Sequence, residues 1–266
     1  MGQAGSAARS SLPAWLGIPL AVAGYAAMTA VMAPAGRLGI HAALAVAELA
    51  LVTPILAALV FLHIPPAAGL ALRRPVRRVG LLALAAGAAF WAASLGLIEL
   101  QSFVWPPEPG YIEGFRRLHE ALRPDGPLDM IVSVAAIALL PALCEEIVLR
   151  GVVLPSLGAL GAGGAVVVSS VLFAAIHDPY RMPFTFAVGL GLGMLRVRSG
   201  SLVPPILAHA LLNTTTFVAA MFFDDPAQDT LDPRPLLGAA LLLAGAAASL
   251  LAVRAIGRHG SRAADA

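Results

Sequence analysis

The stretch "PALCEEIVLRG", residues 141–151, places Glu145, Glu146 and Arg150 inside an otherwise apolar segment. A charged side chain within a membrane span costs about 2.5–3.5 kcal/mol, so such residues usually face a cavity or a partner. Glu146 and Arg150 stand four residues apart with the acid first, the favourable order for an ion pair on one helix face. Glu145 is rotated by about 100° and lacks such a counter-ion. An unpaired, poorly solvated carboxylate can act as a general base or acid.

Two later apolar segments carry polar residues at the same spacing. "FAAIH" sets His177 four residues after Phe173, and "HALLN" sets Asn213 four residues after His209. Each pair shares one face of a helix. With Glu145, three segments each carry a titratable or hydrogen-bonding pair, and together these residues can form one site within the membrane. The alternative is structural: the histidines pack between helices, and the two glutamates tie helices together through Arg150.

The composition indicates what kind of elements position these residues. Of 266 residues, 59% are hydrophobic and 12% charged, and the mean hydropathy is +0.86. Soluble proteins are roughly a quarter charged, and about 20 apolar residues cross a bilayer. We therefore predict an all-α, polytopic transmembrane bundle that forms a single integral membrane domain over residues 1–266. The eight predicted spans are 14–34, 41–63, 79–100, 129–156, 163–178, 183–197, 202–223 and 236–256.

Arginine orients the predicted bundle, because the sequence contains no lysine. With eight spans, the side that holds both termini carries ten arginines, and the other side carries six together with the acidic stretch 224–232. The positive-inside rule then places both termini in the cytoplasm. The arginines are dispersed over several loops instead of forming one basic face, so we expect no nucleic-acid partner. The expected partners are the lipid bilayer and a membrane-associated protein or peptide.

The three motifs together resemble those of a known family, the CPBP intramembrane proteases, which include CAAX prenyl endopeptidases and the Abi proteins of bacteriocin processing and immunity. The family signature EExxxR, FxxxH and HxxxN stands here as "EEIVLR", "FAAIH" and "HALLN", in the same order and on three hydrophobic segments. The resemblance covers about residues 129–215, four predicted spans, which we take as the catalytic core. Residues 1–128 and 216–266 carry no motif that matches the family.

The resemblance implies a role for each motif residue. Glu145 would activate a water molecule with the help of His177, while His209 and Asn213 would bind the oxyanion. Glu146 and Arg150 would orient Glu145 and the substrate backbone. Phe173 supports the second motif.

A metal cofactor is the point on which the motifs allow two mechanisms. Glu145, His177 and His209 could supply three ligands to a zinc ion and leave the fourth position open, as catalytic zinc sites do. However, the sequence has no HExxH motif, and the same residues serve a metal-free, glutamate-activated water equally well. We favour the metal-free mechanism. Cys144 is the only cysteine, which excludes an internal disulfide and a cysteine cluster for a metal.

Three further features are interpreted as structural. Gly189 and Gly193 form a G-x-x-x-G pair, which lets helices approach closely in lipid. The segment "GYIEGFRRLHEAL" has the apolar spacing of an amphipathic helix in the outer interface, where it could also cover the site. Glu48, halfway along the second predicted span, needs a partner, for which an arginine from another span is the simplest candidate and the substrate the second.

The sequence therefore predicts an intramembrane endopeptidase. The processed substrate could be a CAAX-type protein, a bacteriocin or leader peptide, or a C-terminal sorting signal. A non-catalytic immunity or scaffold protein with the same fold is the alternative, and a proton-coupled transporter could also use intramembrane Glu and His. A bias towards arginine and alanine is typical of a GC-rich genome, so we expect a bacterial inner membrane.

Overall fold

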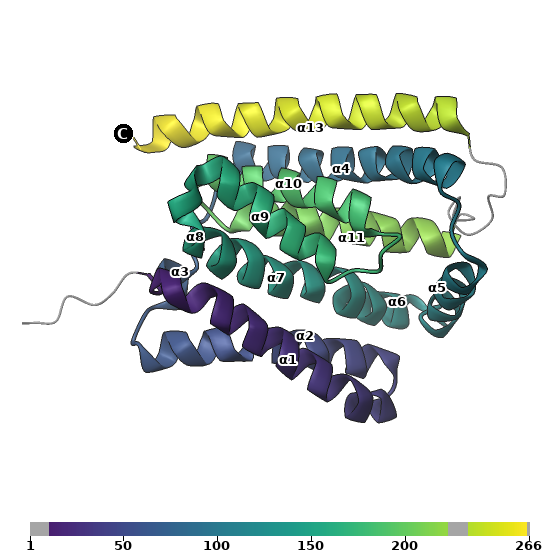
Figure 1. Ribbon diagram of the computed structural model, residues 1–266, viewed down its shortest axis with the longest axis horizontal. Coiled ribbons are helices and arrows are strands. Elements are labelled where there is room, and N and C mark those ends of the chain that lie inside the picture. Colours follow the sequence, from purple (N-terminus) through teal and green to yellow (C-terminus); the bar gives the residue numbers. More distant parts are fainter. Residues whose placement is uncertain (1–10, 223–233, 265–266) are drawn as a thin grey trace, which may run out of the picture.

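The computed structural model describes residues 11–222 and 234–264, and within these ranges all regular structure is helical. The long helices lie side by side along the longest dimension of the molecule (Figure 1). The all-α polytopic class predicted from composition is confirmed. The helices longer than one turn are α1 (Gly17–Ala35), α2 (Ile40–Phe61), α3 (Pro66–Gly69), α4 (Arg77–Val104), α5 (Pro109–Ala121), α6 (Pro127–Val134), α7 (Leu140–Glu146), α9 (Gly161–Ala175), α10 (Met182–Ser199), α11 (Val203–Phe222) and α13 (Pro235–Ala264).

Seven helical stretches among the described residues are long and apolar enough to cross a membrane, one fewer than the eight spans predicted. The exception is α10, which corresponds to the predicted span 183–197. Its last turn carries Arg196 and Arg198, which lower its mean hydropathy. The helix packs against α9, α11, α4 and α13, so other helices cover much of its surface. α10 is therefore less apolar than the other predicted spans, although it also runs along the bundle (Figure 1).

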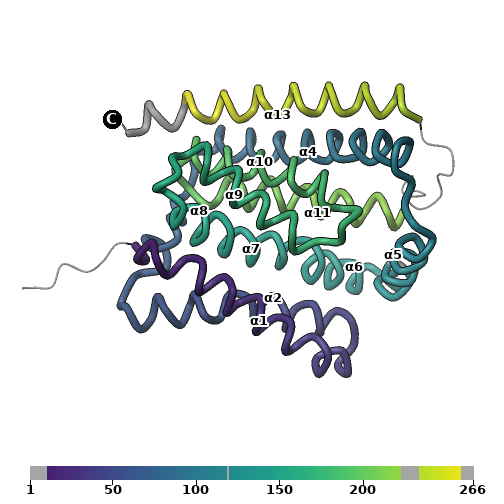
Figure 2. The backbone as a smooth tube through the Cα atoms, viewed as in Figure 1, coloured from purple at the N-terminus to yellow at the C-terminus, as the bar shows by residue number. Residues whose placement is uncertain are grey.

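The loops gather at two ends of the bundle. At one end, the Leu202 amide donates to the Ala71 carbonyl (3.0 Å), and the Ser201 hydroxyl donates to the Arg73 carbonyl (2.6 Å). The described chain also begins and finishes at this end (Figure 2). At the opposite end, the Gln101 amide donates to the Tyr180 carbonyl over 2.7 Å. The loops therefore group as expected for a chain in which α10 also passes between the two ends.

The helix that carries the first motif is continuous over Pro127–Ser156, but it is not regular. α6 and α7 are joined by a π-helical segment, η3 (Ala135–Leu139), and a second π-helical segment, η4 (Ile147–Val153), follows α7. One short turn, α8 (Leu154–Ser156), completes the stretch. Insertions of this kind in α-helices occur frequently at functional sites. Every residue of η4 is buried, so this part of the helix lies in the core.

The G-x-x-x-G pair on α10 faces α9, as predicted. A Cβ atom added at Gly189 would come within 3.0 Å of Ser170 Cβ, and one added at Gly193 within 2.9 Å of a Val166 methyl group. Larger residues at either position would separate the two helices. Since α9 ends two residues before His177, this close packing positions the second motif.

Candidate active site

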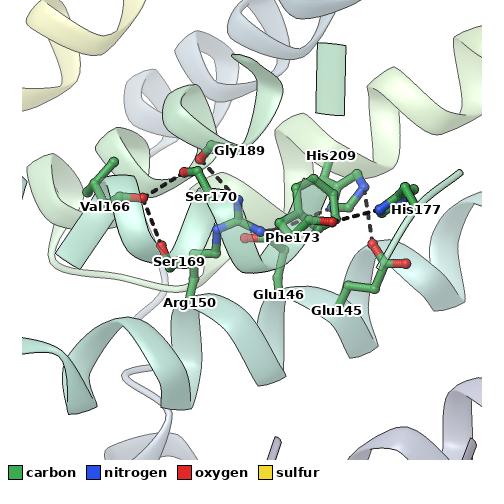
Figure 3. A network of polar contacts seen from close by, with 10 residues as sticks. All are labelled: Glu145, Glu146, Arg150, Val166, Ser169, Ser170, Phe173, His177, Gly189 and His209. Atoms are coloured by element: carbon green, nitrogen blue, oxygen red, sulfur yellow. Dashed lines mark hydrogen bonds and ion pairs between the residues drawn. The ribbon is translucent and has the colours of Figure 1, made fainter. Parts of the chain in front are cut away.

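Glu146 and Arg150 form the ion pair that their spacing predicts. Arg150 Nη1 lies 2.8 Å from Glu146 Oε1, and both side chains are 0% exposed. The second terminal nitrogen of Arg150 donates to the Gly189 carbonyl over 3.0 Å, and its guanidinium lies 4.8 Å from the centroid of the Phe173 ring. Arg150 therefore joins the first motif to α9 and α10 (Figure 3).

His209 lies between the two glutamates. Its Nδ1 is 3.1 Å from Glu146 Oε1, and its Nε2 is 3.7 Å from Glu145 Oε2 (Figure 3). A carboxylate that already accepts from Arg150 acts as an acceptor only, so Nδ1 of His209 carries the hydrogen. Nε2 then points towards Glu145. The two glutamates differ in exposure as well, because the Glu145 side chain is 16% exposed and that of Glu146 is not exposed at all.

The orientation of His177 is fixed by the main chain of its own motif. Its Nδ1 lies 2.7 Å from the Phe173 carbonyl oxygen, which can only accept, so Nδ1 is the donor. Nε2 of the neutral ring is then left with a free lone pair. Burial, followed by the positive charge of Arg181, lowers the pKa of His177 to about 4. The imidazole is therefore neutral at pH 7, and its Nε2 can accept a hydrogen bond.

Phe173 connects the histidines through its ring. The ring meets His177 edge-on with centroids 4.8 Å apart, and it meets His209 in the same manner at 5.7 Å. With only 2% of its surface exposed, Phe173 keeps both imidazoles in place.

A cavity of about 310 Å³ opens beside these groups. His177, His209 and Asn213 contribute to its wall, and most of the remaining lining is aromatic or aliphatic, from α4, α5, α10 and α11. None of Glu145, Glu146 and Arg150 lines it, and Glu145 approaches it only through its 3.7 Å contact with His209. The expected role of Glu146 and Arg150 in orienting the substrate backbone therefore has no support in their contacts: both lie behind His209.

The predicted metal ligands do not fit a metal site. In the part of the chain that the structure describes, no three His, Cys, Asp or Glu side chains are arranged so that they could hold a metal ion. Glu145, His177 and His209 do not form such a group either, and we derive no catalytic step through a metal.

Glu48 has a different environment from the one predicted. Its Oε2 is buried without a hydrogen-bond partner among the described residues, and no arginine pairs with it, so the predicted ion pair was wrong. The buried hydroxyl of Tyr25 also lacks a partner in this part of the chain. α2, which carries Glu48, packs against α7, the helix that carries Glu145 and Glu146.

Comparison with known families agrees with these motifs. Residues 127–215 match the model of the family described as type II CAAX prenyl endopeptidase Rce1-like. This match, over residues 127–215, supports a relationship to the CPBP family of intramembrane proteases. The matched region covers almost the same residues as the predicted core, 129–215, and contains all three motifs. No curated protein and no solved structure matches the chain.

Two contributors to the site carry no motif signal. The Gly189 carbonyl, which accepts from Arg150, is a main-chain group, and only the G-x-x-x-G pattern marks its position. Arg181 lines the cavity, but in the sequence it is one of several arginines in loops.

Proposed function

We propose that the chain is an intramembrane endopeptidase that hydrolyses a peptide bond of a membrane-associated protein or peptide. The observation that carries the proposal is that His177, His209 and Asn213 line one largely apolar cavity, with Glu145 Oε2 3.7 Å from Nε2 of His209. The match to a protease family supports the same reaction class. A non-catalytic immunity or scaffold protein is the alternative, and no contact of the site favours it.

In the proposed reaction, Glu145 takes a proton from a water molecule as the water oxygen bonds to the scissile carbonyl carbon. The neutral His177 ring, whose Nε2 is free, accepts a hydrogen bond from the same water and orients it. When the tetrahedral intermediate collapses, the C–N bond breaks and the leaving amine takes the proton from Glu145. Both products then leave with the base restored.

The developing oxyanion needs donors, a role that the proposal assigns to His209 and Asn213. Because Nδ1 of His209 donates to Glu146, Nε2 has a hydrogen to donate only when the ring is protonated on both nitrogens. The hydrogen bond to Glu146 fixes the orientation of the ring. Glu146 thus acts through His209, and donors fixed in a water-poor site stabilise a developing charge strongly.

The apolar cavity suits a hydrophobic segment of the substrate. Substrates consistent with this chemistry are CAAX-type proteins, bacteriocin or other leader peptides, and C-terminal sorting signals, in a bacterial inner membrane. Comparative proteomics of membrane and secreted fractions, with wild type and Glu145→Ala, would identify the substrate as a protein that is shortened only with wild type.

Cleavage of that substrate by the purified protein in lipid vesicles tests the function. Glu145→Gln removes the base and keeps the side-chain volume, so we expect no cleavage and an unchanged thermal unfolding temperature. Cleavage by Glu145→Gln at the wild-type rate would show that the assignment is wrong.

A second measurement separates the two mechanisms. In the metal-free reaction, prolonged chelation leaves proteolysis intact, and Asn213→Ala lowers turnover by about 10²–10³, the cost of losing one oxyanion donor. Elemental analysis of active protein provides the contrast. A stoichiometric metal that disappears in His209→Ala, but remains in Asn213→Ala, would establish the zinc mechanism instead.

A further inference from the structure

The cavity beside the site contains one feature that the proposed hydrolysis does not use. Among the described residues that line it, Arg181 is the only one with a permanent charge. Arg181 precedes α10, and Tyr111 and Phe115 of α5 belong to the same wall. A permanent charge in so apolar a cavity indicates that the cavity receives something besides hydrocarbon.

Arg181 has no acidic partner in the described part of the chain, where the ion pairs involve other residues. The nearest acid in sequence, Asp178, accepts the Tyr180 main-chain amide over 2.9 Å instead. The guanidinium lies 5.6 Å from the centroid of the Phe184 ring, so this ring covers one face of the guanidinium. The nitrogens around its edge remain available to a ligand.

Arg181 lies close to the proposed catalytic groups. It lines the same cavity as His177, His209 and Asn213, so a group bound to Arg181 would lie near the scissile bond. A guanidinium binds a carboxylate through two parallel hydrogen bonds, and both are strengthened by the opposite charges. A partly buried cation without a partner gains most from such a ligand, because part of its solvation is already lost.

We propose that Arg181 determines substrate specificity by binding a carboxylate of the substrate, so that the preferred substrate is an apolar segment with a carboxylate close to the scissile bond. The inference rests on the proposed function in assigning this ligand to a substrate. The carboxylate has two sources, the C-terminus of the peptide or an Asp or Glu side chain. Both present the same planar pair of oxygens to Arg181.

Three quenched fluorescent peptides of one apolar sequence separate these sources. The first ends in a free carboxylate, the second in a carboxamide, and the third in a carboxamide with one Gln replaced by Glu. For wild type in lipid vesicles, we expect KM for the carboxylate that Arg181 recognises to be about 10-fold to 100-fold below that of the carboxamide, as for a charge-assisted hydrogen bond. Whichever of the first and third peptides shows this difference identifies the source.

Arg181→Gln should abolish the preference, because KM for the favoured peptide rises to that of the carboxamide. Arg181→Lys should restore part of it, because an ammonium lacks the paired geometry. The matched control is Arg116→Gln on α5, whose arginine is 52% exposed and pairs with Glu113; it should retain the full preference. Equal KM values for all three peptides with wild type, or an undiminished preference in Arg181→Gln, would overturn the inference.

Binding of the same peptides to Glu145→Gln, measured by fluorescence anisotropy, keeps the inference separate from the proposed function. If Glu145→Gln prefers the carboxylate peptide and Glu145→Gln/Arg181→Gln does not, the role of Arg181 is supported even when no peptide is cleaved. In that case only the proposed protease function is refuted. Equal affinities refute the role of Arg181, even if wild type cleaves the peptides.

Discussion

Glu146 connects the two residues that depend on its charge, Arg150 and His209. Glu146→Gln leaves Arg150 as a buried charge without a counter-ion, which costs about 3–5 kcal/mol. We therefore expect a large loss of stability in SDS-unfolding titrations, together with a loss of cleavage because His209 loses its charge partner. The double variant Glu146→Leu/Arg150→Met, in which no charge is left unpaired, should be more stable than Glu146→Gln. A Glu146→Gln protein as stable as wild type would contradict the ion pair.

Replacing Glu48 should stabilise the protein, whereas replacing Glu146 should destabilise it. Its buried Oε2 has no hydrogen-bond partner in the described ranges, and an unsatisfied buried polar group costs about 1–3 kcal/mol. Glu48→Leu should therefore raise the free energy of unfolding by about this amount. Glu99→Leu is the control, because Glu99 is 5% exposed and accepts the Arg234 amide over 2.8 Å. Destabilisation of both variants to the same extent would show that Glu48 is satisfied in the membrane.

Helical spacing predicts contacts within one motif and fails for contacts between motifs. The Glu146–Arg150 pair and the separate surroundings of Glu145 follow from four-residue spacing and from rotation about one helix. The approach of His209 to both glutamates depends on how α11 packs against α7, which no local pattern contains. The wrong partner predicted for Glu48 has the same origin, since pairing between spans depends on their packing.

At the scale of elements, the lengths of the apolar segments predict where the helices lie but not where the helices are irregular. The predicted span 129–156 forms as one helix, but its two π-helical segments leave no mark in its hydropathy. α10 was predicted as a span because it lies between two turns and is largely apolar. Glycine, which favours close packing, and the arginines of its last turn reduce its hydropathy below that of a lipid-facing helix.

The contact between α9 and α10 provides a test at this scale. Gly189→Ala would bring a methyl group within 3.0 Å of Ser170, and overpacking of this kind costs about 1–3 kcal/mol. It would also displace the carbonyl that accepts from Arg150, so cleavage should fall as well. Gly163→Ala on α9 has no atom within 4 Å of the added carbon and should be neutral or stabilising, because alanine favours a helix. Unfolding titrations that show equal stability for the two variants would refute the role of Gly189 in packing.

For the molecule as a whole, the grouping of loops decides the topology. Loops that alternate in the sequence meet in space, as Ala71 meets Leu202 at one end and Gln101 meets Tyr180 at the other. Counting apolar helices alone gives seven passes and would put the ends of the chain on opposite sides. The contacts favour a chain in which α10 completes an eighth pass. The side that faces the cytoplasm stays a prediction from arginine counts, and Arg9 and the acidic stretch 224–232 lie outside the described residues.

Cysteine labelling in intact cells can distinguish these topologies. Cys144 is the only cysteine and is 2% exposed, so Cys144→Ala provides a background without reactive thiols. Single cysteines at Arg77 and Arg258 occupy exposed positions at the end that carries most arginines. A single cysteine at Arg116 lies at the opposite end.

With a membrane-impermeant maleimide, we expect Arg116→Cys to react in intact cells, and Arg77→Cys and Arg258→Cys to react only after the membrane is opened, because the positive-inside rule retains the arginine-rich end in the cytoplasm. Labelling of Arg77→Cys and Arg258→Cys from opposite sides would mean that α10 does not cross, since an odd number of passes separates the two positions in that case. Labelling of both from outside would keep the bundle and invert its orientation, which would place the cavity opening near α5 on the cytoplasmic side.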